Sequence, residues 1–151
     1  MKLKSPFGMS PTGVGPLVYL HAVPFILMGI IFPYDYPSNV FLQTLGLFLI
    51  VAGISIFIST MKLLLGKFNN GELATTGAFA FSRNPLYSCW ILLIIPGLAL
   101  LFLNWWFIFG SLSMYMGLNL LIKKEEDMLE QAFGQEFLDY KKKVGRVFLI
   151  I

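Results

Sequence analysis

The sequence predicts an all-α integral membrane protein with about four transmembrane helices and a cytoplasmic, interfacial C-terminal helix. Apolar residues make up 57% of the 151 residues, and the mean hydropathy is +0.76. This exceeds what the surface of a water-soluble domain of this size accommodates. Several apolar stretches also approach the roughly 20 residues that cross a hydrocarbon core. Finally, the basic residues fall at the ends of these stretches, as in membrane proteins.

The four predicted spans are residues 15–32, 40–61, 86–103 and 105–122. Each is expected to be helical, because unpaired backbone amides are too costly in lipid and four spans cannot close a barrel. Pro24 and Pro96 fall in the middle of the first and third spans, so these helices should bend there. Asn104 alone separates the last two spans, which should therefore form a tight antiparallel hairpin.

The distribution of positive charge predicts the orientation in the membrane. All the basic residues lie on the side that both termini share, and the opposite loops hold none. These residues are Lys2, Lys4, Lys62, Lys67, Arg83, Lys123, Lys124, Lys141, Lys142, Lys143 and Arg146. Both termini are therefore expected in the cytoplasm, with the cell inner membrane as the expected location.

The C-terminal segment predicts an amphipathic helix. Leu129, Phe133 and Phe137 are spaced four residues apart and share one helical face. Such a helix lies in the membrane interface or packs back on the bundle. Gly134 is expected to bend or divide it. No repeat or linker separates this segment from the rest, so residues 1–151 are interpreted as one membrane domain.

Composition also argues against several functions. The net charge of +3 is not gathered on a soluble domain, so no nucleic-acid partner is expected. Cys89 is the only cysteine, which leaves no disulfide and no cysteine-based metal site. The predicted spans contain no Asp, Glu, Lys or Arg, which disfavours an ion-coupled transporter. His21 is interpreted as a packing or interfacial histidine and not as a proton relay.

Nearly all side chains capable of chemistry lie in two cytoplasmic segments, residues 71–87 and 123–146. In the first, Arg83 and Asn84 precede a helix start, where free backbone amides favour an anionic group. In the second, Glu125 and Glu126 follow the fourth span directly. Each segment has a simpler interpretation, as a connector with a snorkelling Arg83 or as a solvated face. Together they could enclose a polar, zwitterionic cofactor against the bundle.

These segments resemble the superfamily of isoprenylcysteine carboxyl methyltransferases and phospholipid methyltransferases. The resemblance covers roughly residues 71–146, about half of the chain. The matching motifs are Thr75-Thr76-Gly77-Ala78-Phe79, Arg83-Asn84-Pro85-Leu86-Tyr87, Glu125-Glu126-Asp127-Met128-Leu129, Phe133-Gly134-Gln135-Glu136-Phe137, Tyr140 and Arg146. Their order, and their separation by one membrane hairpin, make the set more specific than any single motif.

The resemblance implies an S-adenosylmethionine-dependent methyltransferase that acts on a lipophilic or membrane-associated small acceptor, with membrane lipids around it. It implies that the cofactor is bound by Glu72, Leu73, Ala74, Phe79, Arg83, Asn84, Pro85, Leu86, Tyr87 and Glu125. No metal is expected. If the acceptor must lose a proton, Tyr87 and Glu126 are the candidate catalytic bases.

Two positions depart from the family pattern. Asn84 stands where a histidine is frequent, and it hydrogen-bonds but does not titrate near neutral pH. Leu121 stands where enzymes acting on prenylated cysteine have an arginine for the substrate carboxylate. Prenylcysteine is therefore not the expected acceptor, and an amine headgroup, a thiol or another small lipophile remains open.

Two other functions are also considered. One is an NADPH-dependent membrane lipid or steroid reductase, whose C-terminal layout is similar but whose cofactor diphosphate favours more arginines than Arg83 and Arg146. The other is a non-enzymatic membrane scaffold that associates through small residues, such as Ser113 and Gly117 one helical turn apart. Methyl transfer is preferred because it gives both cytoplasmic motifs a role.

Overall fold

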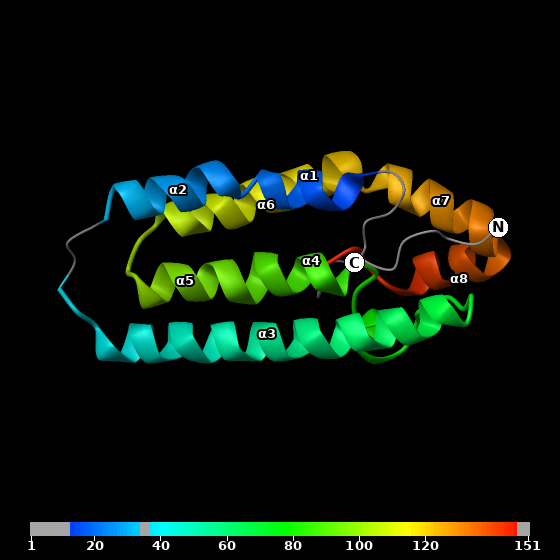
Figure 1. The fold of residues 1–151 in the computed structure, drawn as a ribbon, viewed down its shortest axis with the longest axis horizontal. Helices are drawn as coiled ribbons and strands as arrows, with labels where there is room; N and C mark the ends of the chain where they lie inside the picture. The colour runs from blue at the N-terminus through cyan, green and yellow to red at the C-terminus, as the bar shows by residue number, and fades with distance from the viewer. Residues whose placement is uncertain (1–12, 34–36, 148–151) are drawn as a thin grey trace.

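The computed structural model describes residues 13–33 and 37–147, which form helices and no strand. Figure 1 shows them as a long bundle with two shorter helices at one end. The elements are α1 (Val14–Leu20), α2 (Val23–Ile31), α3 (Val40–Asn69), η1 (Gly77–Ala80), α4 (Pro85–Cys89), η2 (Trp90–Ile94), α5 (Ile95–Leu101), α6 (Trp106–Leu121), α7 (Lys123–Phe133) and α8 (Gln135–Lys143).

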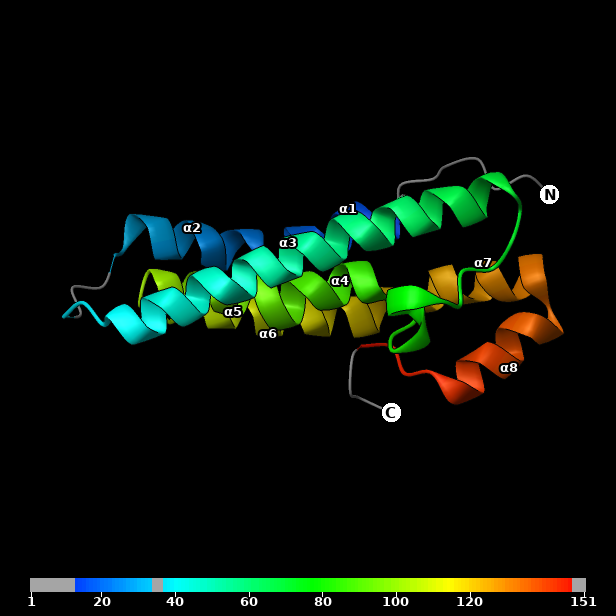
Figure 2. The ribbon, with the colours of Figure 1, turned by 90° about the horizontal axis from the view of Figure 1, so that it is seen from below.

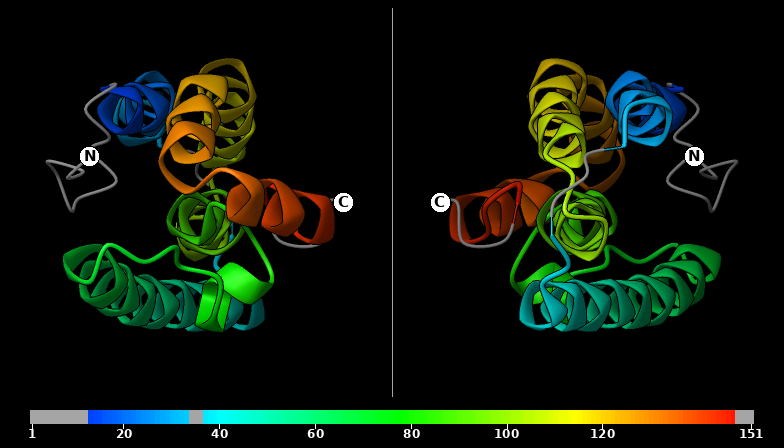
Figure 3. Two further views of the ribbon diagram at one scale, coloured as in Figure 1. Left: turned by 90° about the vertical axis from the view of Figure 1, so that its right-hand side faces the viewer. Right: turned by 90° about the vertical axis from the view of Figure 1, so that its left-hand side faces the viewer.

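The central rod of the bundle is α4, η2 and α5, which follow one another along one axis (Figure 1). The end-on views in Figure 3 show this rod between α3 on one side and α6 on the other. Helices α1 and α2 lie beside α6. Figure 2 shows that α7 and α8 extend past the rod at the end where the segment from α3 to α4 also lies.

The helices fit a membrane in length and surface. Val14–Ile31 and Val40–Asn69 are each long and apolar enough to cross, and α6 with α7 counts as a third if their 46° bend lies within one span. Residues Pro85–Leu101 form a shorter apolar helix. Large apolar side chains, such as Phe48 on α3 and Leu120 on α6, are exposed along the bundle, which suits lipid and not water. The chain is therefore an all-α membrane protein.

The first and third predicted spans both depart from regular α-helix close to the prolines at which bends were expected. The first helix is interrupted at His21 and Ala22, just before Pro24 in the first turn of α2. Before Pro96, the rod widens into the π-helix η2, where the Ile95 N–H donates to the Trp90 carbonyl. Proline lacks an amide hydrogen and its ring crowds the preceding turn, so the backbone ahead of it adjusts its hydrogen bonds.

Helix α3 is longer than the predicted second span of residues 40–61. Helix α3 continues past Met61 to Asn69, so Lys62 and Lys67 are helical and not part of a loop. Leucines and lysines in this stretch are good helix formers. Leu63 also packs against the backbone at Gly77, as the close approach of its side chain shows. The cytoplasmic segment predicted at residues 71–87 begins just after this helix ends.

Two small residues bring α3 against the rod. A Cβ on Gly46 would lie 2.6 Å from the Gly97 carbonyl oxygen, and a Cβ on Gly97 would lie 2.8 Å from the Gly46 carbonyl oxygen. No side chain fits between two backbones this close. His21 is placed in a similar way, because its ring packs on Gly117 while its Nδ1 donates to the Leu17 carbonyl at 2.7 Å. This contact supports the packing interpretation of the histidine.

The predicted hairpin between the last two spans is observed, with Asn104 inside it. The Asn104 side chain is buried and its amide donates to the carbonyls of Gly29 at 2.9 Å and Phe32 at 3.3 Å. Its oxygen accepts from the Trp106 N–H at 3.0 Å. Asn104 therefore caps the end of α2 as well as the start of α6.

Gly134 was expected either to bend or to divide the C-terminal helix, and in the structure it divides the helix into α7 and α8. Its φ of +55° lies in the left-handed region, and α8 turns away from α7 there (Figure 2). Leu129, Phe133 and Phe137 still share one cluster, packed with Leu73 and Tyr140. The segment thus packs back on the chain that follows α3. Its place in the membrane interface remains a prediction.

Candidate functional site

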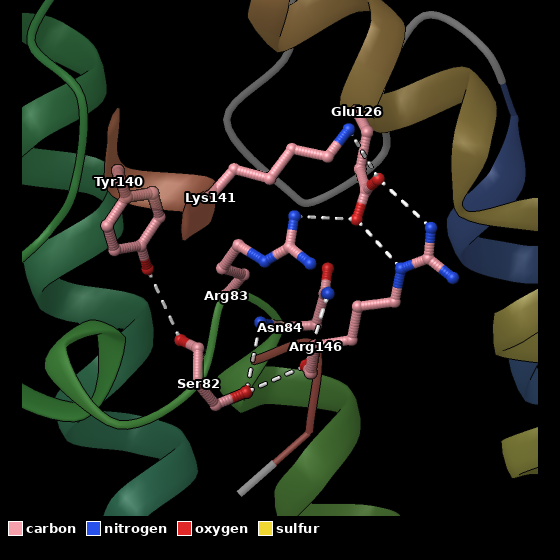
Figure 4. Close-up of polar contacts among 7 residues, drawn as sticks. All are labelled: Ser82, Arg83, Asn84, Glu126, Tyr140, Lys141 and Arg146. Atoms are coloured by element: carbon pink, nitrogen blue, oxygen red, sulfur yellow. Dashed lines mark hydrogen bonds and ion pairs between the residues drawn. The ribbon is translucent and has the colours of Figure 1, made fainter. Parts of the chain in front are cut away.

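The structure brings the two predicted cytoplasmic motifs together. Arg83 precedes α4, Glu126 lies in the first turn of α7, and their side chains pair at 3.0 Å (Arg83 Nη1 to Glu126 Oε1) (Figure 4). One turn into α4, the Tyr87 hydroxyl donates to Glu125 Oε1 at 3.3 Å. The adjacent residues Glu125 and Glu126 therefore contact different groups, because successive side chains of a helix point about 100° apart.

Glu126 is the centre of a buried ion-pair network (Figure 4). Its side chain is 5% exposed and also receives Arg146 Nε at 2.9 Å, Arg146 Nη2 at 3.1 Å and Lys141 Nζ at 3.2 Å. Burial by itself raises the pKa of Glu126, but the hydrogen bond from Arg146 and the charge of Arg83 bring that pKa below its usual value. Glu126 is therefore held in its charged form as the shared partner of three cations.

The residues that follow α8 hold the loop before α4 in place. The Arg146 carbonyl accepts from Ser82 Oγ at 2.9 Å, and from both the backbone and the side-chain amide of Asn84 at 3.2 Å. The Gly145 carbonyl accepts from the Arg83 N–H at 2.8 Å. Asn84 stands where the family pattern often has a histidine. Its side-chain amide is used in a hydrogen bond to the Arg146 carbonyl, which joins the loop to the C-terminal segment.

Glu125 lies beside a group of aromatic rings. Tyr87 packs on Tyr19 of α1 with ring centroids 5.4 Å apart, and Tyr19 contacts Trp90 edge-on at 5.9 Å. Burial raises the pKa of Glu125 to about 7, although the hydrogen bond from Tyr87 opposes the shift. A carboxylate next to aromatic faces attracts a cationic group.

The other predicted residues have mixed positions. Pro85, Leu86, Leu73 and Ala74 are buried, and Leu73 belongs to the cluster under α8. Phe79 is also buried, and its carbonyl accepts from the Tyr140 hydroxyl at 2.6 Å. Burial places these side chains inside the protein, and their roles at the cofactor remain predictions.

Glu72 is not brought to the motifs. Its exposed side chain pairs with Lys67 at 2.6 Å, at the end of α3. Lys67 lies five residues earlier in the chain, and the ion pair is at the surface. The expectation that it lines the same pocket as Tyr87 remains untested.

Four side chains in these neighbourhoods were not among the predicted site residues. Tyr19 and Trp90 come from spans, where an aromatic residue normally indicates packing and carries no site signal. Lys141 and Arg146 come from the C-terminal segment. For Arg146 a signal existed, because it closes the motif pattern. Tyr19 had none, because only the fold places the first helix against α4.

A basic pocket of about 280 Å³ opens beside the ion-pair network. It lies between the end of α6, α8 and the residues that follow α8. Its lining is Arg83, Tyr115, Asn119, Lys141, Lys142, Lys143, Val144, Gly145, Arg146 and Val147. The described residues contain no group of three or more His, Cys, Asp or Glu placed to hold a metal ion.

Comparison with known protein families identifies a relationship. The family model described as phospholipid methyltransferase matches residues 39–136, nearly two thirds of the chain. That range starts at the cap of α3 and ends in the first turn of α8, so it includes both motifs and excludes α1, α2 and Arg146. Searches of the curated proteins and of solved structures found no significant match.

Proposed function

The chain belongs to the phospholipid methyltransferase family, and we propose that it is an S-adenosylmethionine-dependent methyltransferase acting on a lipophilic or membrane-associated small acceptor. Membership implies a membrane methyltransferase. The contact between Tyr87 of α4 and Glu125 of α7 is the observation that carries the proposal, because it joins the two motifs at one acidic and aromatic position.

The residues present fit the charges of this cofactor. S-adenosylmethionine has a sulfonium and an ammonium, which suit the Glu125 carboxylate and the rings of Tyr87 and Tyr19. It also has a carboxylate, which suits a buried guanidinium. Arg83 Nε is buried and has no hydrogen-bond partner within residues 13–33 and 37–147, so it retains a donor for such a group.

When bound, the cofactor supplies an electrophilic methyl group. The chain then has to align the acceptor and exclude water, because in-line approach governs methyl transfer. An amine or thiol acceptor must also lose a proton. Glu125, with a pKa near 7, is better placed for that step than Glu126, which its cation partners keep ionised. We therefore propose that Glu125 accepts the proton of the methyl acceptor. Tyr87 positions the Glu125 carboxylate through its hydrogen bond.

We also propose four spans with both termini in the cytoplasm. The rod Pro85–Leu101 lies between α3 and α6 (Figure 3), so it crosses with them despite its shorter apolar length. The described basic residues belong to segments at one end of the bundle, namely the end of α3, the loop before α4, α7, and α8 with its following residues. A one-sided positive end favours the cytoplasm, and the inner membrane of a cell fits this arrangement.

The test is calorimetric titration of detergent-purified protein with S-adenosylhomocysteine, and with NADPH in parallel. We expect saturable binding of S-adenosylhomocysteine that Glu125→Gln weakens, because the amide loses the charge that attracts the ammonium. The matched control is Glu136→Gln, since this glutamate is exposed on α8 away from Tyr87.

Equal affinity of the wild type and Glu125→Gln would remove the assigned site. Absence of S-adenosylhomocysteine binding by folded protein would overturn the proposed cofactor. Binding of NADPH in its place would identify a reductase on the same fold.

A further inference from the structure

The pocket between α6, α8 and the residues following α8 is distinct in charge from the Glu125 neighbourhood. Five of its lining side chains are cationic. Their carboxylate partners are Glu126, which contacts Arg83, Lys141 and Arg146, and Asp139, which pairs with Lys142 at 3.4 Å. Two carboxylates against five cations leave an excess of three positive charges around about 280 Å³. Such a concentration favours an anionic ligand.

Two of these cations, Lys142 and Lys143, are exposed to solvent. The Lys142 side chain is 73% exposed, and Lys143 is exposed with no ion-pair partner among the described residues. Below them, Arg83 Nε is a buried donor without a partner in the same part of the chain. The lining therefore combines exposed lysine charges with a guanidinium whose Nε has no partner among the described residues.

One wall of the pocket belongs to the predicted membrane span. Tyr115 and Asn119 lie one turn apart on α6, and Asn119 is exposed. Leu112 and Met116 lie on the same side of the helix and are 54% and 65% exposed. A basic pocket is thus continuous with an apolar surface, which matches a ligand that has both an anionic head and an apolar chain.

We propose that this pocket binds the phosphate of an anionic membrane phospholipid, with the lipid chains along the exposed face of α6. An anionic headgroup is favoured over a zwitterionic one, because the latter brings an ammonium group next to an excess of positive charge. Arg83 is shared with the proposed cofactor site, whereas Lys142 and Lys143 line this pocket and take no part in the proposed function. The lipid site is therefore tested at these two lysines. In this proposal the three consecutive lysines of α8 contribute the positive charge that attracts the phosphate.

The experiment measures binding of phosphatidylglycerol to the full chain in detergent by native mass spectrometry, with phosphatidylcholine and glycerol phosphate as parallel probes. The double variant Lys142→Gln/Lys143→Gln removes two exposed charges from the pocket. The control Lys123→Gln/Lys124→Gln removes two exposed charges of the same kind from α7, outside the pocket.

We expect phosphatidylglycerol to bind more tightly than phosphatidylcholine, and the pocket variant to lose about tenfold or more in affinity while the control changes little. Equal losses in both variants would reduce the effect to general surface charge and overturn the site. Equally tight binding of glycerol phosphate would assign the pocket to a soluble anion. Displacement of the lipid by S-adenosylhomocysteine would assign the pocket to the cofactor.

Discussion

The Tyr87 hydroxyl donates to the Glu125 carboxylate at 3.3 Å, and this contact links the first turn of α4 to the first turn of α7. The two residues lie 38 positions apart in sequence. Only the hairpin of α5 and α6 returns the chain to the same end of the bundle (Figure 1). The contact also separates the roles of two adjacent glutamates, since Glu126 turns toward Arg83 and Arg146.

The first prediction concerns pH. Burial raises the pKa of Glu125 to about 7, so its carboxyl is largely neutral below that value and charged above it. Affinity for S-adenosylmethionine, which is cationic, should therefore rise as pH increases through about 7. Calorimetric titrations across this range test it. Glu125→Gln should show a flat profile, and a wild-type profile that is equally flat would contradict the assignment.

The second prediction concerns the ion-pair network. Glu126→Gln leaves Arg83, whose side chain is 11% exposed, without its counter-charge. Removing one partner of a buried pair costs about 3 kcal/mol, because the remaining charge stays desolvated. Thermal unfolding in detergent should show a clear decrease in Tm. Glu136→Gln, an exposed change of the same kind, should leave Tm unchanged. A similar Tm for both variants would show that the network contributes little.

The third prediction compares two glycines of α3. A Cβ on Gly46 meets the Gly97 oxygen and the Leu101 nitrogen at 2.6 Å, so Gly46→Ala must push α3 away from α5. A Cβ on Gly66 has nothing within 4 Å, and Gly66→Ala should stabilise the helix by up to about 1 kcal/mol. Unfolding of the two variants in one detergent measures the difference. Equal stabilities would argue against this packing.

The fourth prediction concerns the tip of the hairpin. Asn104→Ala removes two hydrogen bonds to the end of α2 and one to the start of α6. The Gly29 carbonyl, whose hydrogen bond is buried, and the Phe32 carbonyl, whose hydrogen bond is partly buried, lose their donor, which costs about 2 kcal/mol. Asn70→Ala, at the exposed end of α3, is the control and should change stability by less than about 0.5 kcal/mol. A mild effect at Asn104 would mean that water replaces its amide.

The sequence by itself predicted the helical membrane class, a disturbance of the helices at Pro24 and Pro96, the hairpin around Asn104 and a bend or division at Gly134. These features depend on local chemistry, namely apolar length, missing amide hydrogens and backbone freedom. It also predicted the two motifs, because their residue types and order are visible without a fold. The count of four spans and the binding roles of the motif residues remain predictions.

Tertiary structure decided which side chains meet. Glu125 and Glu126 are equivalent by sequence, but helix geometry turns one toward Tyr87 and the other toward three cations. Tyr19 joins the site only because α1 packs against the start of α4. The basic pocket forms because α8 returns past α6. Local sequence encodes helices and their ends, whereas contacts between distant residues depend on how helices pack, and burial then sets the charge state of each group.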